Sequence, residues 1–453
     1  MNRSCPTQPR WPLPLARVLT NGWPLMLMRI SRQATDIAHS IPGLRAKYRR
    51  WDWPALATSA IAALVVGLAS PVHTSQQTWG LIATVGYACA SLAAARSPVR
   101  WPHLAGFIAV IGTVAVPLVW LTVAGLEQME VGVVERGADL LTSSGTPYLH
   151  HPVEVPDFNP YLPGMTLFGL PRVLFGDSML TSARLWCLVG YLATAIGAMR
   201  VTMQGVCRYE RGSTTATGVL WLTACPLVAL PLAFGGVDPP VVGLLLLALA
   251  CAHRGRPGLS GVALGVAASL KWTAWPAIPV VASLLMASGG RRPAAKCVVV
   301  STGVGALAVL PPLLVDPAGF YQNVVLYPFG LSATTSSAES PLLGHLLVAT
   351  LPHGKSVAVA LIAVSAVAVA ASLLIRPPRT AAAAAHRLGW GLSLAIALSP
   401  ATRVGYAIYP VVLFVWPSLC RLTRSTRGKD STDTAQWREG PPARSHPGRA
   451  VAP

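Results

Sequence analysis

The sequence predicts an all-α polytopic membrane protein with about twelve transmembrane helices (about ten to fourteen). Three observations lead to this fold class. First, 53% of the 453 residues are hydrophobic and 11% are charged, whereas soluble domains contain about a quarter charged residues. Second, apolar segments long enough to cross a bilayer recur along the chain. Third, the basic residues gather in both tails and in short loops. This pattern excludes a soluble globular enzyme, a collagen-like chain and a disordered protein.

The predicted spans are placed by their apolar runs. They lie near 53–71, 77–95, 104–126, 184–203, 215–234, 239–252, 259–271, 273–288, 296–315, 357–375, 388–400 and 404–420. Several are short or contain Pro and Gly, which membrane helices tolerate when neighbouring helices satisfy the backbone. A further apolar stretch, 162–176, is interrupted by Pro163, Gly164 and Pro171. We expect an interfacial or re-entrant helix there.

The distribution of charge divides the chain into three parts. We expect a basic cytoplasmic tail at 1–52, a multi-span transmembrane domain at 53–420 and a disordered basic cytoplasmic tail at 421–453. With the N-terminus inside and the spans alternating, most of the 35 Lys and Arg residues fall on the cytoplasmic side. The sequence therefore predicts a multi-pass protein of the cell (plasma) membrane with both termini in the cytoplasm. The net charge of +19 then favours anionic membrane lipids as partners, and no nucleic acid.

Two outer loops, 127–161 and 316–356, follow from this arrangement, and the first carries most of the candidate chemistry. Loops of such length are usually functional or disordered. Apolar residues recur at roughly helical spacing in the first loop and predict a helix over 128–142 along the membrane surface. Glu130 lies at its start, where partial desolvation makes a carboxylate a better general base. The alternative is a solvated acid favoured by the helix dipole.

The first outer loop also carries an ordered series of short motifs. They are Glu130, Val133-Val134, Gly137-Ala138, Leu140-Leu141, Gly145, Pro147-Tyr148 and Asn159-Pro160-Tyr161-Leu162-Pro163-Gly164. The series resembles the first periplasmic loop of the GT-C glycosyltransferases, specifically glycosyltransferase family 87. That family includes bacterial polyprenyl-phosphate-mannose-dependent mannosyltransferases.

The resemblance continues downstream, and taken together it covers roughly residues 100–420. The further segments are FGGVDPPVVGLLLLALA, GLSGVALGVAASLKWTAWP, SPLLGHLL at 340–347 and LSPATRVGYAIYPVV. The sequence departs from the family pattern in three places. Glu130 replaces Asp, and Gln is missing near 235, where Gly236 and Asp238 stand. The final element, which often carries histidines, has Arg403, Tyr406 and Tyr409.

The resemblance implies a membrane-embedded hexosyltransferase that moves a sugar, with mannose expected, from a polyprenyl-phosphate donor. The acceptor would be an envelope glycolipid or glycan on the extracytoplasmic face. Glu130 would be the catalytic base, with Glu127, Glu135, Asp139 and Asp157 as weaker choices. Lys271, Arg403 and Arg136, and less directly Arg172, would bind the donor phosphate. The substrate-binding candidates are Asp139, Tyr148, His150, His151, Asp157, Tyr161, Asp238, His345 and Tyr406.

Other interpretations stay open for several of these residues. A cation at the outer end of a span is costly and usually has a partner, so Lys271 could equally form a structural ion pair with Asp238 or Asp316. Trp272, Trp275 and Tyr327 suit stacking on a sugar, although an interfacial aromatic belt explains them as well.

No cofactor is expected apart from the donor substrate itself. No P-loop, G-x-S-x-G or dinucleotide fingerprint is present, and no cysteine pair has metal-site spacing. A divalent ion held by Glu and Asp is left open. Two other functions also stay open. A transporter or lipid flippase would show repeated halves and mid-membrane ionisable residues, and a GT-C relative without activity would fit the departures from the family pattern.

Overall fold

The computed structural model describes residues 51–99, 101–204, 208–328, 330–332, 334, 340 and 342–425. Within these ranges every regular element is a helix. The tails expected at 1–52 and 421–453 lie almost entirely outside the described residues.

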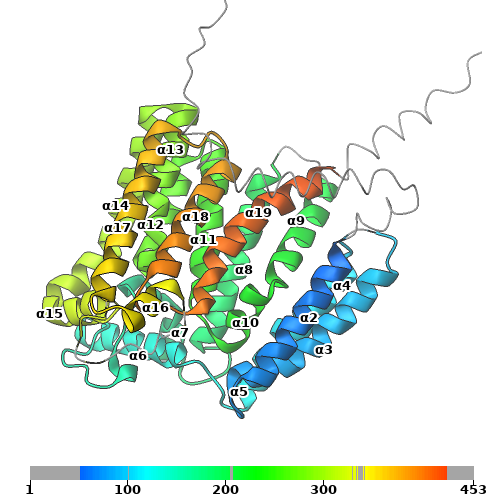
Figure 1. The fold of residues 1–453 in the computed structure, drawn as a ribbon, viewed down its shortest axis with the longest axis horizontal. Helices are drawn as coiled ribbons and strands as arrows, with labels where there is room; N and C mark the ends of the chain where they lie inside the picture. Colours follow the sequence, from blue (N-terminus) through cyan, green and yellow to red (C-terminus); the bar gives the residue numbers. More distant parts are fainter. Residues whose placement is uncertain are drawn as a thin grey trace, which may run out of the picture.

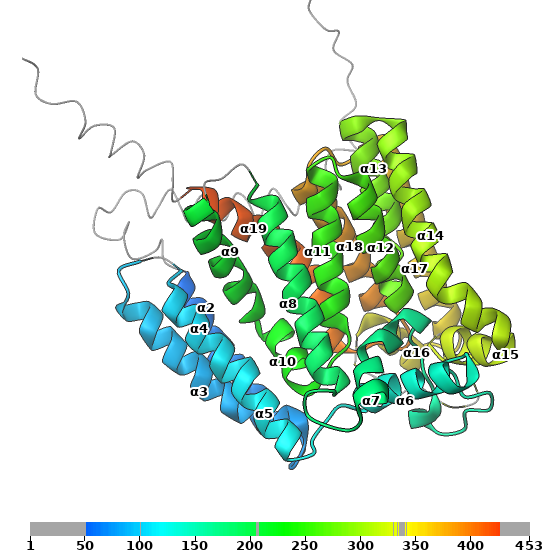
Figure 2. The same ribbon diagram turned by 180° about the vertical axis from the view of Figure 1, so that it is seen from behind.

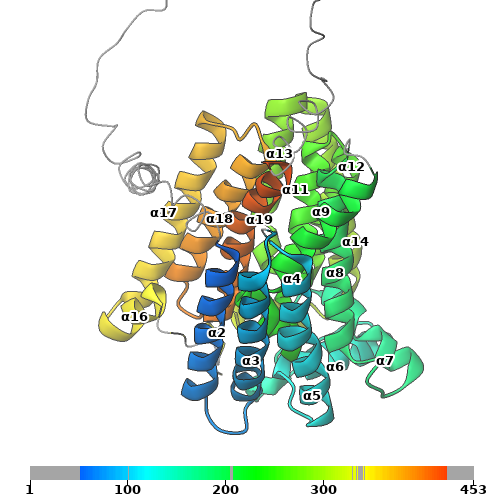
Figure 3. The same ribbon diagram turned by 90° about the vertical axis from the view of Figure 1, so that its right-hand side faces the viewer.

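Three N-terminal spans form a layer of their own (Figures 1 and 3). They are α2 (Asp52–Ala69), α3 (Ser75–Arg96) and a composite helix of α4 (His103–Val110), the π-helix η1 (Ile111–Ala115) and α5 (Val116–Val123). Gly86 of α3 faces Gly112 of η1, and a Cβ added at Gly86 would lie 2.8 Å from the Cα of Gly112. Only glycine permits this approach of the two backbones, so the close packing of the layer follows from its small residues.

The remaining long helices form a bundle beside this layer (Figure 2). They are α8 (Ala183–Thr202), α11 (Asp238–His253), α12 (Pro257–Leu270), α13 (Ala277–Gly289), α14 (Arg291–Val315), α17 (Gly354–Ile375), α18 (Ala381–Leu398) and α19 (Ile408–Ser425). Most residues of α11 are buried, so this short helix lies in the core. Contacts to the N-terminal layer come from α9 (Arg208–Thr223) and α10 (Pro226–Phe234), which are bent by 76° relative to one another.

The predicted spans all coincide with helical segments, but they differ in length. Within the described ranges, eight helices are long and apolar enough to cross a membrane, or up to nine if the bent α9–α10 pair is one span. The qualifying helices are α2, α3, His103–Val123, α8, Trp272–Gly289, α14, α17 and α18. The other four predicted spans correspond to the bent pair and to three shorter apolar helices, Asp238–His253, Pro257–Leu270 and Val404–Cys420. The chain is therefore a multi-pass membrane protein, and the part of it that the structure describes is all-helical.

Short helices cover one end of the bundle (Figures 1 and 2). They are α6 (Met129–Ser144), η2 (Val155–Asp157), η3 (Pro163–Phe168), α7 (Leu170–Phe175), α15 (Pro317–Phe320), the π-helix η5 (Tyr321–Leu326) and α16 (Leu343–Thr350). The helix expected over 128–142 is α6, and the stretch 162–176 forms two short helices in place of one. Both predicted outer loops thus meet at one end, whereas α2 begins and α19 ends at the other (Figure 1).

Candidate active site

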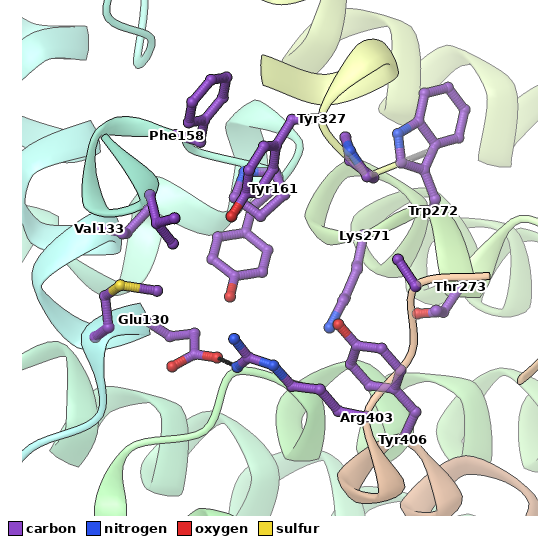
Figure 4. A pocket seen from close by; sticks show the side chains of 15 residues that line it. Glu130, Val133, Phe158, Tyr161, Lys271, Trp272, Thr273, Tyr327, Arg403 and Tyr406 are labelled. Carbon is purple, nitrogen blue, oxygen red and sulfur yellow. Dashed lines mark hydrogen bonds and ion pairs between the residues drawn. The ribbon is translucent and has the colours of Figure 1, made fainter. Parts of the chain in front are cut away.

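A pocket of about 190 Å³ lies where α6 meets two short turns, η4 (Trp272–Ala274) and η6 (Val404–Ala407). Three charged residues line it, namely Glu130, Lys271 and Arg403, and Figure 4 shows all three side chains directed at the same space. The rest of the lining is largely apolar and aromatic. This combination of a few convergent polar groups in an otherwise apolar wall is typical of a ligand site.

Glu130 lies in the first turn of α6 and is only 9% exposed. The neighbouring Val131 and Val134 pack into the core, which fixes the helix and so the direction of the carboxylate. Arg403 donates from Nη1 to Oε1 of Glu130. Oε2 of Glu130 is buried and accepts no hydrogen bond from any residue that the structure describes. An unsatisfied buried carboxylate oxygen is costly, so Oε2 is the oxygen of this carboxylate with capacity for a further donor.

Lys271 stands at a break between α12 and η4, in extended conformation (φ −157°, ψ 144°). The loop before η3 holds this break in place, because Leu162 N–H donates to Leu270 C=O at 3.1 Å. Gly164 packs directly on Ser269, where a side chain would not fit. The Lys271 ammonium lies 2.6 Å from Asp238 Oδ1 and 4.5 Å from the centre of the Tyr406 ring.

Arg403 immediately precedes η6, in the turn that connects α18 to α19. Its side chain is 30% exposed, whereas the side chain of Lys271 is 11% exposed. Both cations therefore reach the pocket from turns, not from helix interiors. Their charges are balanced at present by Glu130 and Asp238.

Phe158, Tyr161 and Tyr327 form the wall of the pocket that faces Arg403 (Figure 4). Phe158 and Tyr327 stack with their ring centres 4.2 Å apart and their planes at 11°. Burial raises the pKa of Tyr161 well above 10, and nearby Glu130 acts in the same direction. The Tyr161 phenol therefore stays protonated at neutral pH and can donate a hydrogen bond. The Tyr148 hydroxyl donates to Tyr161 C=O at 3.0 Å and so holds the backbone of Tyr161 in place.

The loop that carries Phe158 and Tyr161 is fastened by a buried asparagine that the sequence did not single out. Asn323, on the π-helix η5, is fully buried. Its Oδ1 accepts from Asn159 N–H at 2.8 Å and its Nδ2 donates to Leu149 C=O at 3.1 Å. Asn159 in turn donates to Pro147 C=O at 3.1 Å. The two asparagines thus join distant parts of the two predicted outer loops.

Comparison with known protein families decides the identity of the chain. Residues 159–400, just over half of the sequence, match glycosyltransferase family 87. The chain belongs to glycosyltransferase family 87. It is therefore a membrane glycosyltransferase, and the resemblance drawn from the loop motifs is confirmed. No curated protein matches the sequence. Lys271 and Asp238 lie inside the matched region, whereas Glu130 and Arg403 flank it.

Several candidates from the sequence lie elsewhere in this family 87 protein. Arg136 does not reach the pocket, because its Nη2 donates to Pro156 C=O at 2.6 Å and to Asp157 C=O at 3.2 Å. Asp157 accepts from the backbone N–H groups of Glu154 and Val153, which lower its pKa. Asp139 is exposed on α6. These residues build the loop around the pocket without lining it.

The histidine candidates also lie outside the pocket. His150 is exposed, and its Nδ1 lies 3.0 Å from Oδ1 of Asp316. The ring of His151 packs edge-on against the ring of His150, with the ring centres 4.4 Å apart. His345 is half-buried on α16 and is not part of the pocket wall. Of the named substrate-binding candidates, Tyr161 and Tyr406 line the pocket, and Asp238 reaches it through Lys271. Trp272 and Tyr327 also line it.

Glu135, a weaker base candidate, has a different position. Its Oε1 accepts from Ala183 N–H at 2.8 Å, at the N-terminus of α8, and its Oε2 lies 2.9 Å from Arg172 Nη1. Arg172 also pairs with Asp177 at 2.6 Å. Burial raises the pKa of Glu135, although Ala183 N–H and Arg172 oppose the rise. Glu135 and Arg172 therefore fasten α6 and α7 to α8.

Metal ligands are not grouped in the parts of the chain that the structure describes: no three His, Cys, Asp or Glu residues there come close enough to hold a metal ion.

Proposed function

We propose that this family 87 glycosyltransferase transfers a hexose, with mannose as the first candidate, from a polyprenyl-phosphate donor to an envelope glycolipid or glycan. The observation that carries the proposal is the convergence of Glu130, Lys271 and Arg403 on one pocket. Such a transfer requires a base for the acceptor hydroxyl and positive charge for the leaving phosphate. The three residues supply both.

In the proposed reaction the acceptor oxygen attacks the anomeric carbon of the donor sugar. The bond between that carbon and the phosphate oxygen breaks, and its electron pair leaves with the polyprenyl phosphate. The proton of the acceptor hydroxyl passes to Oε2 of Glu130, the carboxylate oxygen that lacks a partner among the described residues. Lys271 and Arg403 stabilise the charge that develops on the phosphate. General-base assistance of this kind contributes about 10²–10⁴-fold to a rate.

The pocket wall suits the remaining parts of the substrates. The protonated Tyr161 hydroxyl and the Phe158–Tyr327 stack offer a hydrogen bond and flat apolar faces to a sugar. We place this end of the bundle on the extracytoplasmic face, because the predicted outer loops meet there and the basic residues of the sequence collect in the other loops and the tails. Both termini would then be cytoplasmic, with the tails at 1–52 and 421–453 flanking one transmembrane domain.

The proposal is tested by a transfer assay with purified protein in lipid. Radiolabelled polyprenyl-phosphate-mannose and an envelope lipid extract are supplied to wild type, Glu130→Gln and Asp139→Asn. Asp139 is the matched control, because it lies on the same helix, is exposed and does not line the pocket. We expect a new labelled product from wild type and Asp139→Asn, and none from Glu130→Gln.

Other outcomes separate the parts of the proposal. Equal transfer by wild type and Glu130→Gln would retain the donor and overturn Glu130 as the base. No transfer by wild type from the mannose donor, with transfer from polyprenyl-phosphate-arabinose, would overturn the choice of sugar alone. No transfer from either donor would overturn the donor class.

A further inference from the structure

Lys271 belongs to a continuous chain of hydrogen bonds that extends behind the pocket. Thr273 Oγ1 donates to the Tyr409 hydroxyl at 2.7 Å, and Tyr409 donates to Asp238 Oδ1 at 2.6 Å. The same Oδ1 accepts from Lys271 Nζ at 2.6 Å. An ionised carboxylate can only accept and an ammonium can only donate, so the order of donors along this chain is fixed. Every proton in it points toward Asp238.

The members of this chain come from three separate elements. Asp238 begins α11, Thr273 lies in η4 beside Lys271, and Tyr409 lies in the first turn of α19. Tyr409 is completely buried, and neither it nor Asp238 lines the pocket. The tyrosine hydroxyl therefore acts on the pocket through the groups it bonds: Asp238, which holds Lys271, and Thr273, which lines the pocket.

We propose that Asp238 and Tyr409 are positioning residues that hold the Lys271 ammonium for the phosphate of the donor. This inference rests on the proposed function. A lysine is a point charge on a flexible four-carbon stem, so it needs an anchor to face one place. Asp238 supplies the anchor and takes one of the three N–H donors. Two donors are left for a phosphate, and the ring of Tyr406 supports the charge at 4.5 Å.

Tyr409 sets how strongly Asp238 holds the lysine. Its hydroxyl shares the same carboxylate oxygen as Lys271 Nζ. Without that hydroxyl, this oxygen of Asp238 interacts with Lys271 alone and attracts the ammonium more strongly. The ammonium is then drawn away from the phosphate. The ion pair between Lys271 and Asp238 is thus part of phosphate binding, and not an alternative to it.

The experiment measures direct binding of two probes, farnesyl phosphate and farnesol, to the full chain in lipid. The ratio of the two affinities isolates the contribution of the phosphate from that of the apolar tail. We compare wild type, Tyr409→Phe and Tyr87→Phe. Tyr87 is the matched control, because it is completely buried and donates its hydroxyl to Ala224 C=O at 2.7 Å, outside the pocket.

We expect wild type and Tyr87→Phe to prefer the phosphate equally, and Tyr409→Phe to lose about tenfold of that preference. In the transfer assay, the same variant should raise KM for the donor and leave KM for the acceptor unchanged. A merely structural role would change binding of both probes together. Asp238→Asn should also lower the phosphate preference, because a neutral amide no longer anchors the ammonium at one place, and it serves as the test if Tyr409→Phe does not fold.

The two possible failures are distinguishable. An unchanged phosphate preference in Tyr409→Phe, or in Asp238→Asn if that variant replaces it, overturns the inference and leaves the proposed function intact. No phosphate preference in wild type overturns the proposed donor itself, and with it the inference.

Discussion

Glu130 and Arg403 form an ion pair across 273 residues of sequence. The pair joins the first turn of α6 to the turn that leads into α19, and both residues line the pocket. Removal of one partner from a largely buried pair leaves an uncompensated charge, which is more costly than loss of the pair as a whole. The two residues therefore depend on each other for structure as well as for the proposed chemistry.

Replacement of Arg403 should weaken donor binding. Arg403→Gln removes a cation from the pocket and leaves the Glu130 carboxylate without its charged partner. We expect KM for the donor to rise by about 10–100-fold, which corresponds to about 1.4–2.8 kcal/mol. Arg403→Lys keeps the positive charge but lacks the planar guanidinium. Its KM for the donor should therefore lie between the values of wild type and Arg403→Gln. Steady-state kinetics at varied donor concentration measure KM for wild type and both variants.

Arg136→Gln is the matched control for this prediction. Arg136 was a phosphate candidate from the sequence, but its guanidinium bonds to the backbone of Pro156 and Asp157. Its replacement should loosen the loop and leave KM for the donor within about twofold of wild type. A larger rise in KM for Arg136→Gln than for Arg403→Gln would contradict the arrangement proposed for the phosphate.

Removal of the Glu135 carboxylate should destabilise the junction between α6 and α8. Glu135→Ala leaves Ala183 N–H and Arg172 without their shared acceptor. Loss of a capping acceptor and of a charged hydrogen bond costs about 1–3 kcal/mol. We expect a lower unfolding temperature in detergent for Glu135→Ala, and little change for Asp139→Ala on the exposed face of the same helix. Equal shifts for both variants would show that Glu135 has no special role.

Glu135 also makes stability depend on pH. Burial raises the pKa of Glu135 above its ordinary value of 4.5, so the folded protein binds its proton more tightly than the unfolded chain. The resulting stabilisation is complete below about pH 4.5 and is lost as the pH rises through the folded-state pKa. Glu135→Gln keeps an acceptor for Ala183 N–H without this titration. The unfolding temperature of wild type relative to Glu135→Gln should therefore decrease as the pH rises from 4.5 to 7; an increase would contradict the prediction.

Asn323 should control the order of the loop that carries Phe158 and Tyr161. Asn323→Ala leaves the buried Asn159 N–H and the Leu149 C=O without partners, at about 1–3 kcal/mol for each unsatisfied group. Hydrogen exchange should become faster over residues 147–161, while exchange in α11 stays slow because that helix is buried in the core. Unchanged exchange in the loop would show that other contacts hold it.

The sequence predicts the elements of this fold well wherever apolar periodicity is continuous. The spans predicted at 53–71, 77–95 and 104–126 reappear as α2, α3 and the composite helix α4–η1–α5, and the span predicted at 296–315 reappears as α14. The helical spacing around Val131 predicts α6, and Glu130 is placed in its first turn as expected. These features are local, because helix length and the apolar face follow from neighbouring residues.

Features that depend on partners distant in sequence could not be predicted in the same way. Nothing local to Glu135 indicates that it meets Ala183 N–H, or that Asn159 meets Asn323. The bend of 76° between α9 and α10 falls just before Pro226, and no local sequence pattern sets its angle. Glu130, Lys271 and Arg403 were assigned to one reaction through the family resemblance, but their sequence spacing carries no information on the distances between them.

The central claim is that Glu130 accepts the proton while other residues hold the donor. Its most direct test is the single-turnover rate of Glu130→Gln at saturating donor, measured together with the affinity for farnesyl phosphate. We predict a rate at least about 10²-fold below wild type with phosphate affinity retained within about threefold. A rate equal to that of wild type, with donor bound normally, would contradict the account.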